Sequence, residues 1–170
     1  MSEFTDCYHL RTDDQEEAIN LLKHTGLKGY VFPVENGWVT LVCEKYDFEE
    51  NTELIAGNTG LLLHFIHGED HGWVLTIYDG SKEVCHYHNI WEEGIKDDSK
   101  LNRELILKLI KENQLIESKP GEREIDSIME DPLVFAEMVG LTNYEWISYY
   151  YVSMDYGDDK EIYNNVKEVD

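Results

Sequence analysis

Two stretches of the chain decide its fold: residues 25–39 read TGLKGYVFPVENGWV, and residues 59–74 read TGLLLHFIHGEDHGWV. Each begins with Thr-Gly-Leu after a helical pattern, runs through an apolar segment, crosses a turn that contains glycine, and resumes at Gly-Trp-Val. Apolar segments joined by such a turn predict a β-hairpin. We therefore expect a helix followed by a hairpin to occur twice in the chain.

The first unit carries the clearer local signals. Thr12 and Gln15 fit a capping box at the start of a helix, and Gly26 is the residue type that ends one. Asn36-Gly37 is the dipeptide that a two-residue hairpin turn prefers, because both positions need positive φ. The expected elements are a strand at 6–11, a helix that ends before Gly26, and strands at 28–34 and 38–44.

The second unit has a shorter helical pattern and one strand more. Asp79-Gly80 is a further hairpin signal after its second strand. The two units together predict an α+β domain with a mostly antiparallel sheet of about six strands and helices on one face. The expected elements of this unit are a helix at 48–56 and strands at 61–67, 73–78 and 82–90.

The chain turns helical after Trp91. Asp131-Pro132 places a capping residue before a proline at the first helical position. The segment 142–156 is dense in aromatic residues, which favours a strand, yet Thr142 and Glu145 permit a capping box, and we expect a helix. The predicted organisation is a duplicated core at 1–92, a helical region at 93–156 packed on or extending that core, and an acidic tail at 157–170, in one compact domain. Further helices are expected at 100–113, 122–130 and 133–139.

Acidic residues dominate the charge. The chain has 36 Asp and Glu against 14 Lys and Arg, a formal net charge of −22. Such a surface repels phosphate backbones and anionic lipid, so we expect no nucleic acid and no membrane as partner. It attracts a basic protein. The alternative is that the acidic surface serves solubility alone.

The cellular compartment is predicted from the cysteines and the N-terminal sequence. Cys7, Cys43 and Cys85 are odd in number and lack metal-like spacing, so we expect free thiols in predicted strands and a reducing compartment. The N-terminal residues lack the basic and apolar regions of a signal peptide. No apolar run approaches the roughly 20 residues that span a bilayer. These features predict a cytoplasmic protein.

The histidines are the one group of residues with potential for metal chemistry. Strand side chains alternate between faces, so His64 and His67 point to opposite sides of their strand, whereas His86 and His88 share a face. If the loop between the strands pairs His67 with Trp73, the two lie on one face of the sheet. A two-residue turn at Asp79-Gly80 would then set Trp73 opposite His86, and a turn at Gly80-Ser81 would set it opposite His88. The three imidazoles of His67, His86 and His88 would then share a face and suit Zn²⁺ with one open position. The alternative is that these histidines are structural.

A cluster of aromatic residues in the last third is the other unusual feature. Tyrosine and tryptophan supply much of the energy at protein interfaces. An aromatic patch within an acidic field suits a basic protein partner. The alternative is that these rings pack the helices onto the sheet. The candidate partner-binding residues are Tyr144, Trp146, Tyr149, Tyr150 and Tyr151.

Motifs of common enzyme classes are missing from the sequence. There is no Gly-x-Ser-x-Gly elbow, no phosphate-binding loop and no Gly-x-Gly-x-x-Gly after a strand. We therefore expect a non-enzymatic acidic binding module without a cofactor, such as an inhibitor, an immunity-type protein or a regulatory protein. The alternative is a metal-binding protein or a metal-assisted enzyme that uses zinc at His67, His86 and His88.

Overall fold

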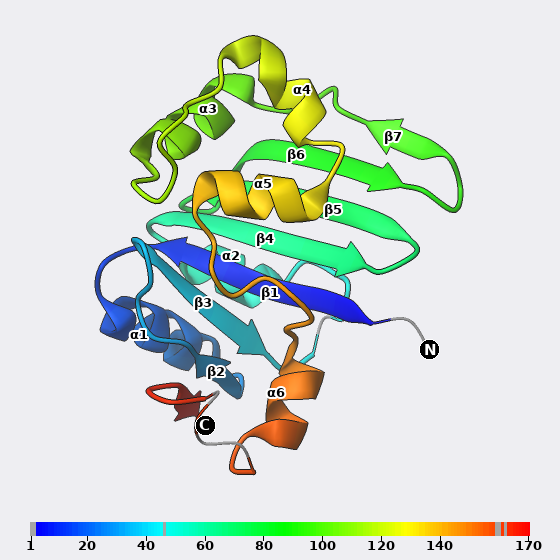
Figure 1. Cartoon of the computed structure of the whole chain (residues 1–170). Helices are drawn as coiled ribbons and strands as arrows, with labels where there is room; N and C mark the ends of the chain where they lie inside the picture. The colour runs from blue at the N-terminus through cyan, green and yellow to red at the C-terminus, as the bar shows by residue number, and fades with distance from the viewer. Residues whose placement is uncertain (1–2, 46, 159–160, 162) are drawn as a thin grey trace.

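The computed structural model describes residues 3–45, 47–158, 161 and 163–170, which form one sheet flanked by helices (Figure 1). The strands are β1 (Phe4–Arg11), β2 (Gly29–Val31), β3 (Trp38–Cys43), β4 (Leu61–Gly68), β5 (Gly72–Asp79), β6 (Lys82–Ile90), β7 (Ile95–Asp97) and β8 (Lys167–Val169). The helices are α1 (Gln15–Thr25), α2 (Thr52–Gly57), α3 (Arg103–Glu112), α4 (Ile125–Ile128), α5 (Pro132–Val139) and α6 (Tyr149–Asp155), with a 3₁₀ turn, η1, at Glu122–Glu124.

The eight strands pair in the order β7-β6-β5-β4-β1-β3-β2-β8, and every pair is antiparallel. The predicted hairpins β2–β3 and β4–β5 both form, and β6 follows β5 as expected. The α+β class with an antiparallel sheet is confirmed. The sheet is larger than the predicted six strands because β7 and β8, each of three residues, add one strand at either edge.

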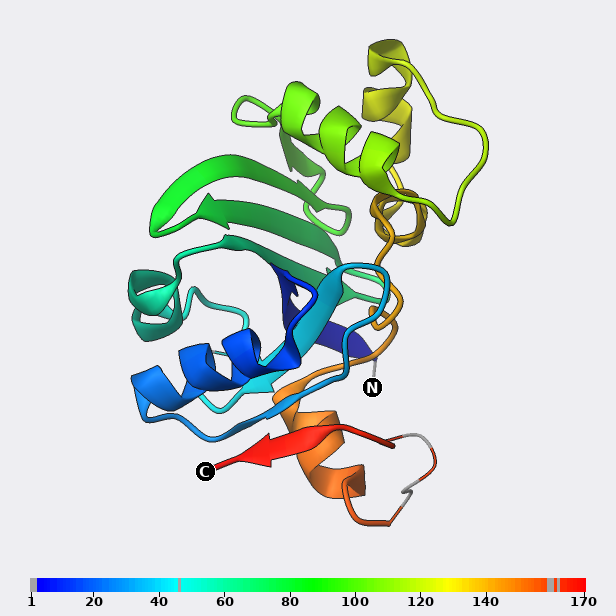
Figure 2. The same cartoon turned by 90° about the vertical axis from the view of Figure 1, so that its left-hand side faces the viewer.

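Apolar side chains fill both faces of the sheet. One core lies against α1 and α2 and includes Leu22, Leu54 and Leu62. The other lies against α3, α4 and α5 and includes Phe65 and Phe135. The two helical layers lie on opposite sides of the sheet in Figure 2. The expectation of helices on one face was therefore wrong, because a strand that is apolar at both alternating positions, as β4 is, has two faces to bury.

The hairpin turn, two helix ends and one helix cap that the sequence predicts have the expected backbone geometry. Asn36 and Gly37 have φ of 52° and 76°, as the tight hairpin turn requires. Gly26 and Gly140 end α1 and α5 in the left-handed conformation. The Asp131 carboxylate caps α5 by accepting from the Leu133 N–H at 2.9 Å.

Other helix starts differ from the prediction by a few residues. The side chain of Asp14, not Thr12, caps α1 by accepting from the Glu16 N–H. The side chain of Asn102 caps α3, and that of Ser148 caps α6. Each of these residue types is a good cap, so neighbouring candidates compete and the packing of the helix decides between them.

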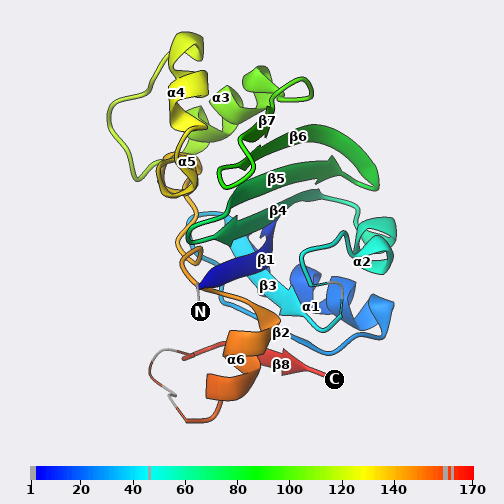
Figure 3. The same ribbon diagram turned by 90° about the vertical axis from the view of Figure 1, so that its right-hand side faces the viewer.

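The C-terminal third is less helical than expected. Within the segment 142–156, only α6 is helical, and the residues before Ser148 run as bends and irregular backbone. Figure 3 shows α6 beside β2 and β8. The predicted acidic tail contributes β8, which pairs with β2 and buries Val169. None of the helices in the described residues is long and apolar enough to cross a membrane.

The repeated segments are alike in local order but not in their place in the sheet. Trp38 and Trp73, from the two Gly-Trp-Val sequences, are both buried in the core against α3 to α5. The first hairpin contacts β1 through its second strand, β3, whereas the second hairpin contacts β1 through its first strand, β4. The repeat therefore describes two similar building units that join β1 differently.

Candidate functional site

A bulge in β6 decides where the histidines lie. The turn between β5 and β6 occupies Gly80-Ser81, one of the two turns that the sequence allows. Beyond it, Tyr78 pairs with Glu83 but Ile77 pairs with Cys85, so one extra residue lies in β6. An extra residue reverses the face on which every later side chain of the strand lies.

The predicted common face for the three histidines is therefore wrong. His67 pairs with Trp73 as expected, but Trp73 pairs with Asn89. His86 and His88 alternate with Asn89 and lie on the opposite face of the sheet from His67. Among the described residues, no group of three or more His, Cys, Asp or Glu side chains is arranged to hold a metal ion.

His86 and His88 form a hydrogen-bonded pair of their own. The Nε2 atom of His86 lies 3.1 Å from Nδ1 of His88, and Nδ1 of His86 lies 3.0 Å from the hydroxyl of Thr76. Burial lowers the pKa of His86, and its neighbour His88 lowers it further, while Glu83 opposes them. The arrangement joins β5 to β6 through a chain of three polar side chains.

His64 is held in a separate polar cluster on the α1–α2 face, away from His67 as predicted. Its Nε2 lies 2.7 Å from the carboxylate of Asp6, and its ring stacks on Tyr8 with centroids 4.0 Å apart. The same carboxylate accepts from the Phe48 N–H at 2.7 Å, and the Tyr8 hydroxyl accepts from the Asn51 N–H at 3.0 Å. These bonds fasten the loop before α2 to the sheet.

A cysteine and a histidine also meet in the interior. The Sγ atom of Cys7 lies 3.2 Å from Nε2 of His9, whose Nδ1 lies 2.9 Å from the hydroxyl of Thr40. Burial raises the pKa of the Cys7 thiol, and burial, aided by the nearby His64, lowers the pKa of His9 to about 3. A nucleophilic cysteine needs the opposite shift in its thiol pKa. This pair is thus a neutral part of the core.

Exposed aromatic side chains gather at the end of the sheet where β1 begins. Phe4 lies 4.9 Å from Phe48 and 5.0 Å from Tyr151, and Tyr151 lies 5.7 Å from Tyr150, all between ring centroids. Phe48 and Tyr150 are 52% and 51% exposed, and Met154, one helical turn after Tyr150, is 60% exposed. We call Phe4, Phe48, Tyr150 and Tyr151 the aromatic ridge.

The backbone holds the ridge in place at some cost. Phe48 has a φ of 61°, a left-handed conformation that a bulky residue adopts only when its surroundings impose it. The hydrogen bond from its N–H to Asp6 fixes that conformation. Tyr150 and Tyr151 lie in the first turn of α6, which begins at Tyr149 after the Ser148 cap. Strained backbone of this kind costs about 1–3 kcal/mol and gathers at functional sites.

The five aromatic residues predicted to bind a partner divide into groups. Tyr150 and Tyr151 lie on the ridge. Tyr149 instead packs against Tyr30, with ring centroids 5.8 Å apart. Tyr144 is half-buried against the core, and its carbonyl accepts from the Thr5 hydroxyl at 3.2 Å. Trp146 lies apart from both groups. Phe4 and Phe48 were not predicted, because isolated phenylalanines carry no signal of exposure.

Trp146 covers His67, so the two separately predicted sites meet. Their rings stack at 5.2 Å with 29° between planes, and the ring of Trp91 stands edge-on to His67 at 5.9 Å and 76°. Trp91 is 40% exposed, whereas His67 is 5% exposed. Trp146 has a φ of 53°, a second strained aromatic residue. We call His67, Trp91 and Trp146 the tryptophan corner.

Two buried nitrogen atoms at this place make no hydrogen bond within the described part of the chain: Nδ1 of His67 and Nε1 of Trp73. Buried polar atoms without partners are uncommon and often mark sites of function. Burial lowers the pKa of His67, against the opposing effect of Asp131 and Glu69. The imidazole is therefore neutral at pH 7, with two carboxylates nearby.

The corner and the ridge occupy the same end of the sheet. On the pairing of β1 with β4, Phe4 of the ridge lies opposite Gly68, and Thr5 lies opposite His67 of the corner. The segment that carries Trp146 is fixed there, because the Ile147 N–H donates to the Thr5 hydroxyl at 3.3 Å. The two groups are therefore close neighbours on the two faces of this end of the sheet.

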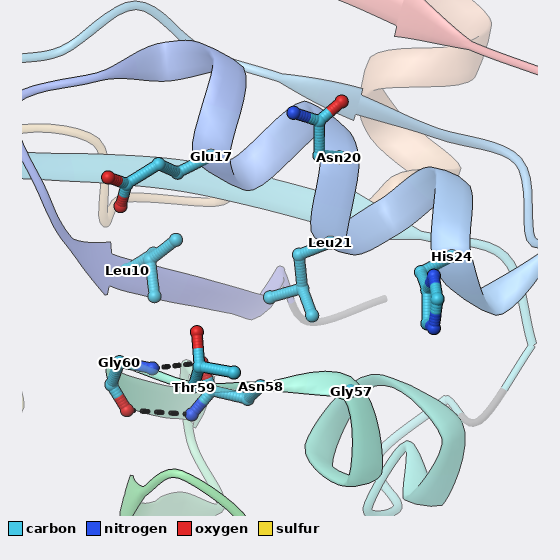
Figure 4. Close-up of a pocket in the computed structure, with 9 residues that line it drawn as sticks. All are labelled: Leu10, Glu17, Asn20, Leu21, His24, Gly57, Asn58, Thr59 and Gly60. Atoms are coloured by element: carbon cyan, nitrogen blue, oxygen red, sulfur yellow. Dashed lines mark hydrogen bonds between the residues drawn. The ribbon is translucent and has the colours of Figure 1, made fainter.

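A pocket of about 660 Å³ lies away from the ridge and the corner, between α1 and the loop that follows α2 (Figure 4). Leu10 and Leu21 are apolar residues of its lining, and Glu17 and His24 are polar ones. The Asn58 amide, also in the lining, already donates to the carbonyls of Gly60 and Gly80 at 2.8 Å each. The sequence carried no signal for this pocket, since its residues come from distant segments.

Comparison of the chain with protein-family models, with curated proteins and with solved structures finds no match.

Proposed function

We propose that the protein is an acidic binding module that holds a basic protein at the aromatic ridge, in the manner of an inhibitor, an immunity-type protein or a regulatory protein. The observation that carries this proposal is the unbroken contact of Phe48, Phe4, Tyr151 and Tyr150, with Phe48 and Tyr150 half exposed. A few clustered residues carry most of the binding energy in a protein interface, and tyrosine is one of the residue types enriched among them.

Charge supports a basic partner. The chain has 22 more acidic than basic residues, 36 against 14. Exposed acids adjoin the ridge in sequence at Glu3, Asp47 and Glu49, and Asp155 lies about one helical turn after Tyr151. An interface with aromatic rings at its centre and charges at its rim gains affinity from the centre and association rate from the rim. Salt screens the rim, so binding weakens as ionic strength rises.

The test compares three forms of the protein as bait in cell lysate. The ridge variant carries Phe48→Asn and Tyr150→Ala; asparagine tolerates the left-handed backbone of Phe48. The matched control is Leu115→Ala, which removes another exposed apolar side chain, 65% exposed, outside the ridge. We expect the wild type and the control to retain the same basic protein, and the ridge variant to lose it.

The captured protein is then purified and its affinity measured at two salt concentrations. We expect the ridge variant to bind at least about tenfold more weakly, since each central residue contributes on the order of 1–2 kcal/mol, and the wild type to weaken with salt. Equal binding by the ridge variant and the wild type would exclude the ridge as the interface. An acidic partner, or one indifferent to salt, would exclude the role of charge.

A further inference from the structure

We infer that His86 and His88 chelate a divalent transition-metal ion, held between Nε2 of His86 and Nδ1 of His88. The pair lies across the sheet from His67 and includes none of the residues of the aromatic ridge. The metal site is therefore a second function of the chain, and it stands or falls separately from the proposed protein interface.

The spacing of the two imidazole nitrogens suits a metal ion. His86 and His88 lie two residues apart on β6, so their side chains share a face of the sheet. Nε2 of His86 lies 3.1 Å from Nδ1 of His88. Two nitrogens at this separation, each about 2.0–2.1 Å from one metal ion, make an angle of about 100° at the metal. That angle lies between those of square-planar and tetrahedral sites, in which imidazole binds copper(II), nickel(II) and zinc(II).

The hydrogen bonds of the pair supply the lone pairs that a metal needs. Nδ1 of His86 lies 3.0 Å from the Thr76 hydroxyl; when its N–H donates to that hydroxyl, Nε2 of the neutral ring carries the lone pair. Hydrogen bonds of this kind orient imidazoles that bind metals. Without metal, the Nδ1–H of His88 donates to Nε2 of His86. When a metal binds, that proton moves to Nε2 of His88, and Nδ1 becomes the second ligand.

A metal ion can reach the pair from solvent. Both rings are half-buried, and none of the helices in the described part of the chain covers β5 and β6 on this face (Figure 2). Burial and the neighbouring His88 lower the pKa of His86, so protons compete little for its nitrogen at pH 7. Glu83 and Asp97 act on His86 against the single opposing charge of Lys100, which favours a cation.

The two imidazoles, and not carboxylates, select the ion. The Asp97 carboxylate accepts from the Ser99 N–H at 2.9 Å, and no third His, Cys, Asp or Glu joins the pair to form a metal-binding group in the described residues. Water therefore fills the other coordination positions. Imidazole suits zinc, nickel and copper, whereas magnesium and calcium prefer oxygen. The pair should bind Zn²⁺ in the presence of Mg²⁺.

The test begins with calorimetric titration of the protein with Zn²⁺, with and without Mg²⁺. We expect a single site that Mg²⁺ does not block. His86→Gln and His88→Gln should each weaken it about tenfold or more, because either change removes one of two chelating nitrogens. The matched control is His71→Gln, which removes a loop histidine that is 54% exposed and should leave the affinity unchanged. Urea unfolding checks that each variant is folded.

Ring ¹⁵N signals of the wild type locate the ion without any substitution. We expect Zn²⁺ to shift Nε2 of His86 and Nδ1 of His88 and to leave His67 unchanged. Displacement of Zn²⁺ by Mg²⁺ would mean that carboxylates of the acidic surface hold the ion. Absence of Zn²⁺ binding, binding that both glutamine variants retain, or shifts confined to other histidines would each exclude the site.

Discussion

Acid should destabilise this protein through His9. The imidazole of His9 is fully buried, and burial, aided by His64, lowers its pKa from 6.5 to about 3. In the unfolded chain the same ring takes a proton near pH 6.5. Above that pH neither state is protonated and the full stability is present. As pH falls below 6.5, His9 of the unfolded state binds a proton, whereas His9 of the folded state stays neutral until about pH 3. Stability is therefore lost between about pH 6.5 and pH 3.

The magnitude follows from the two pKa values. A tenfold difference in proton affinity is worth about 1.4 kcal/mol, so His9 accounts for a loss of about 4 kcal/mol in the free energy of unfolding between pH 7 and pH 3, and about 3 kcal/mol of it by pH 4. That loss is a large part of the 5–15 kcal/mol by which domains are typically stable. Burial also lowers the pKa values of His67 and His86, which adds losses of the same sign.

The assay is urea unfolding, followed by tryptophan fluorescence, of the wild type and His9→Asn at pH 7, 6, 5 and 4. Asparagine does not titrate, and its amide retains a partner for Thr40. We expect the variant to lose about 3 kcal/mol less than the wild type between pH 7 and pH 4, whatever its stability at pH 7. Carboxylates and other histidines are common to both proteins and cancel. Parallel pH profiles would refute the argument.

Two further predictions test the backbone and the histidine faces. Gly72→Ala should lower the free energy of unfolding by about 2–4 kcal/mol, because φ is 125° and the added Cβ would lie 2.1 Å from the carbonyl oxygen of Asn89 in β6. The control is Gly57→Ala, whose added Cβ would lie 3.5 Å from its nearest neighbour, a methyl group of Leu21. In the same urea unfolding, this control should change the free energy of unfolding by less than about 1 kcal/mol. Zinc should shift the melting temperature of the wild type and His67→Gln equally, since His67 lies across the sheet from His86 and His88; a zinc response that His67→Gln abolishes would contradict the assigned faces.

Features set by a few neighbouring residues were predictable. The Asn36-Gly37 turn, the Gly26 and Gly140 helix ends and the Asp131 cap each depend on backbone conformations that only certain residue types favour. The hairpins followed from these signals and from apolar patterns. The two helical layers also had a signal, in strands such as β4 that carry apolar residues at both alternating positions, although the prediction did not use it.

The location of the candidate site was harder to predict, because it depends on a β-bulge and on backbone conformations that no particular residue type signals in the sequence. The bulge in β6 involves ordinary strand residues, yet it moved His86 and His88 to the far face. The left-handed conformations of Phe48 and Trp146 are imposed by packing and hydrogen bonds against their own preference. The aromatic residues of segment 142–156 were singled out from the sequence, but which of the tyrosines at 149–151 face outward depends on where α6 begins, at Tyr149 after its Ser148 cap.

The position of β1 has a consequence for assembly. Its two edges are occupied by β3 and β4, with Tyr8 opposite Leu41 and Phe4 opposite Gly68, so its contacts are far more distant in sequence than those inside either hairpin. Loss of residues 4–11 would not trim the sheet but divide it into a three-strand part and a four-strand part. A chain shortened in this way would be left with a slot one strand wide. A separate peptide with the sequence of β1 should then restore the fold by fragment complementation.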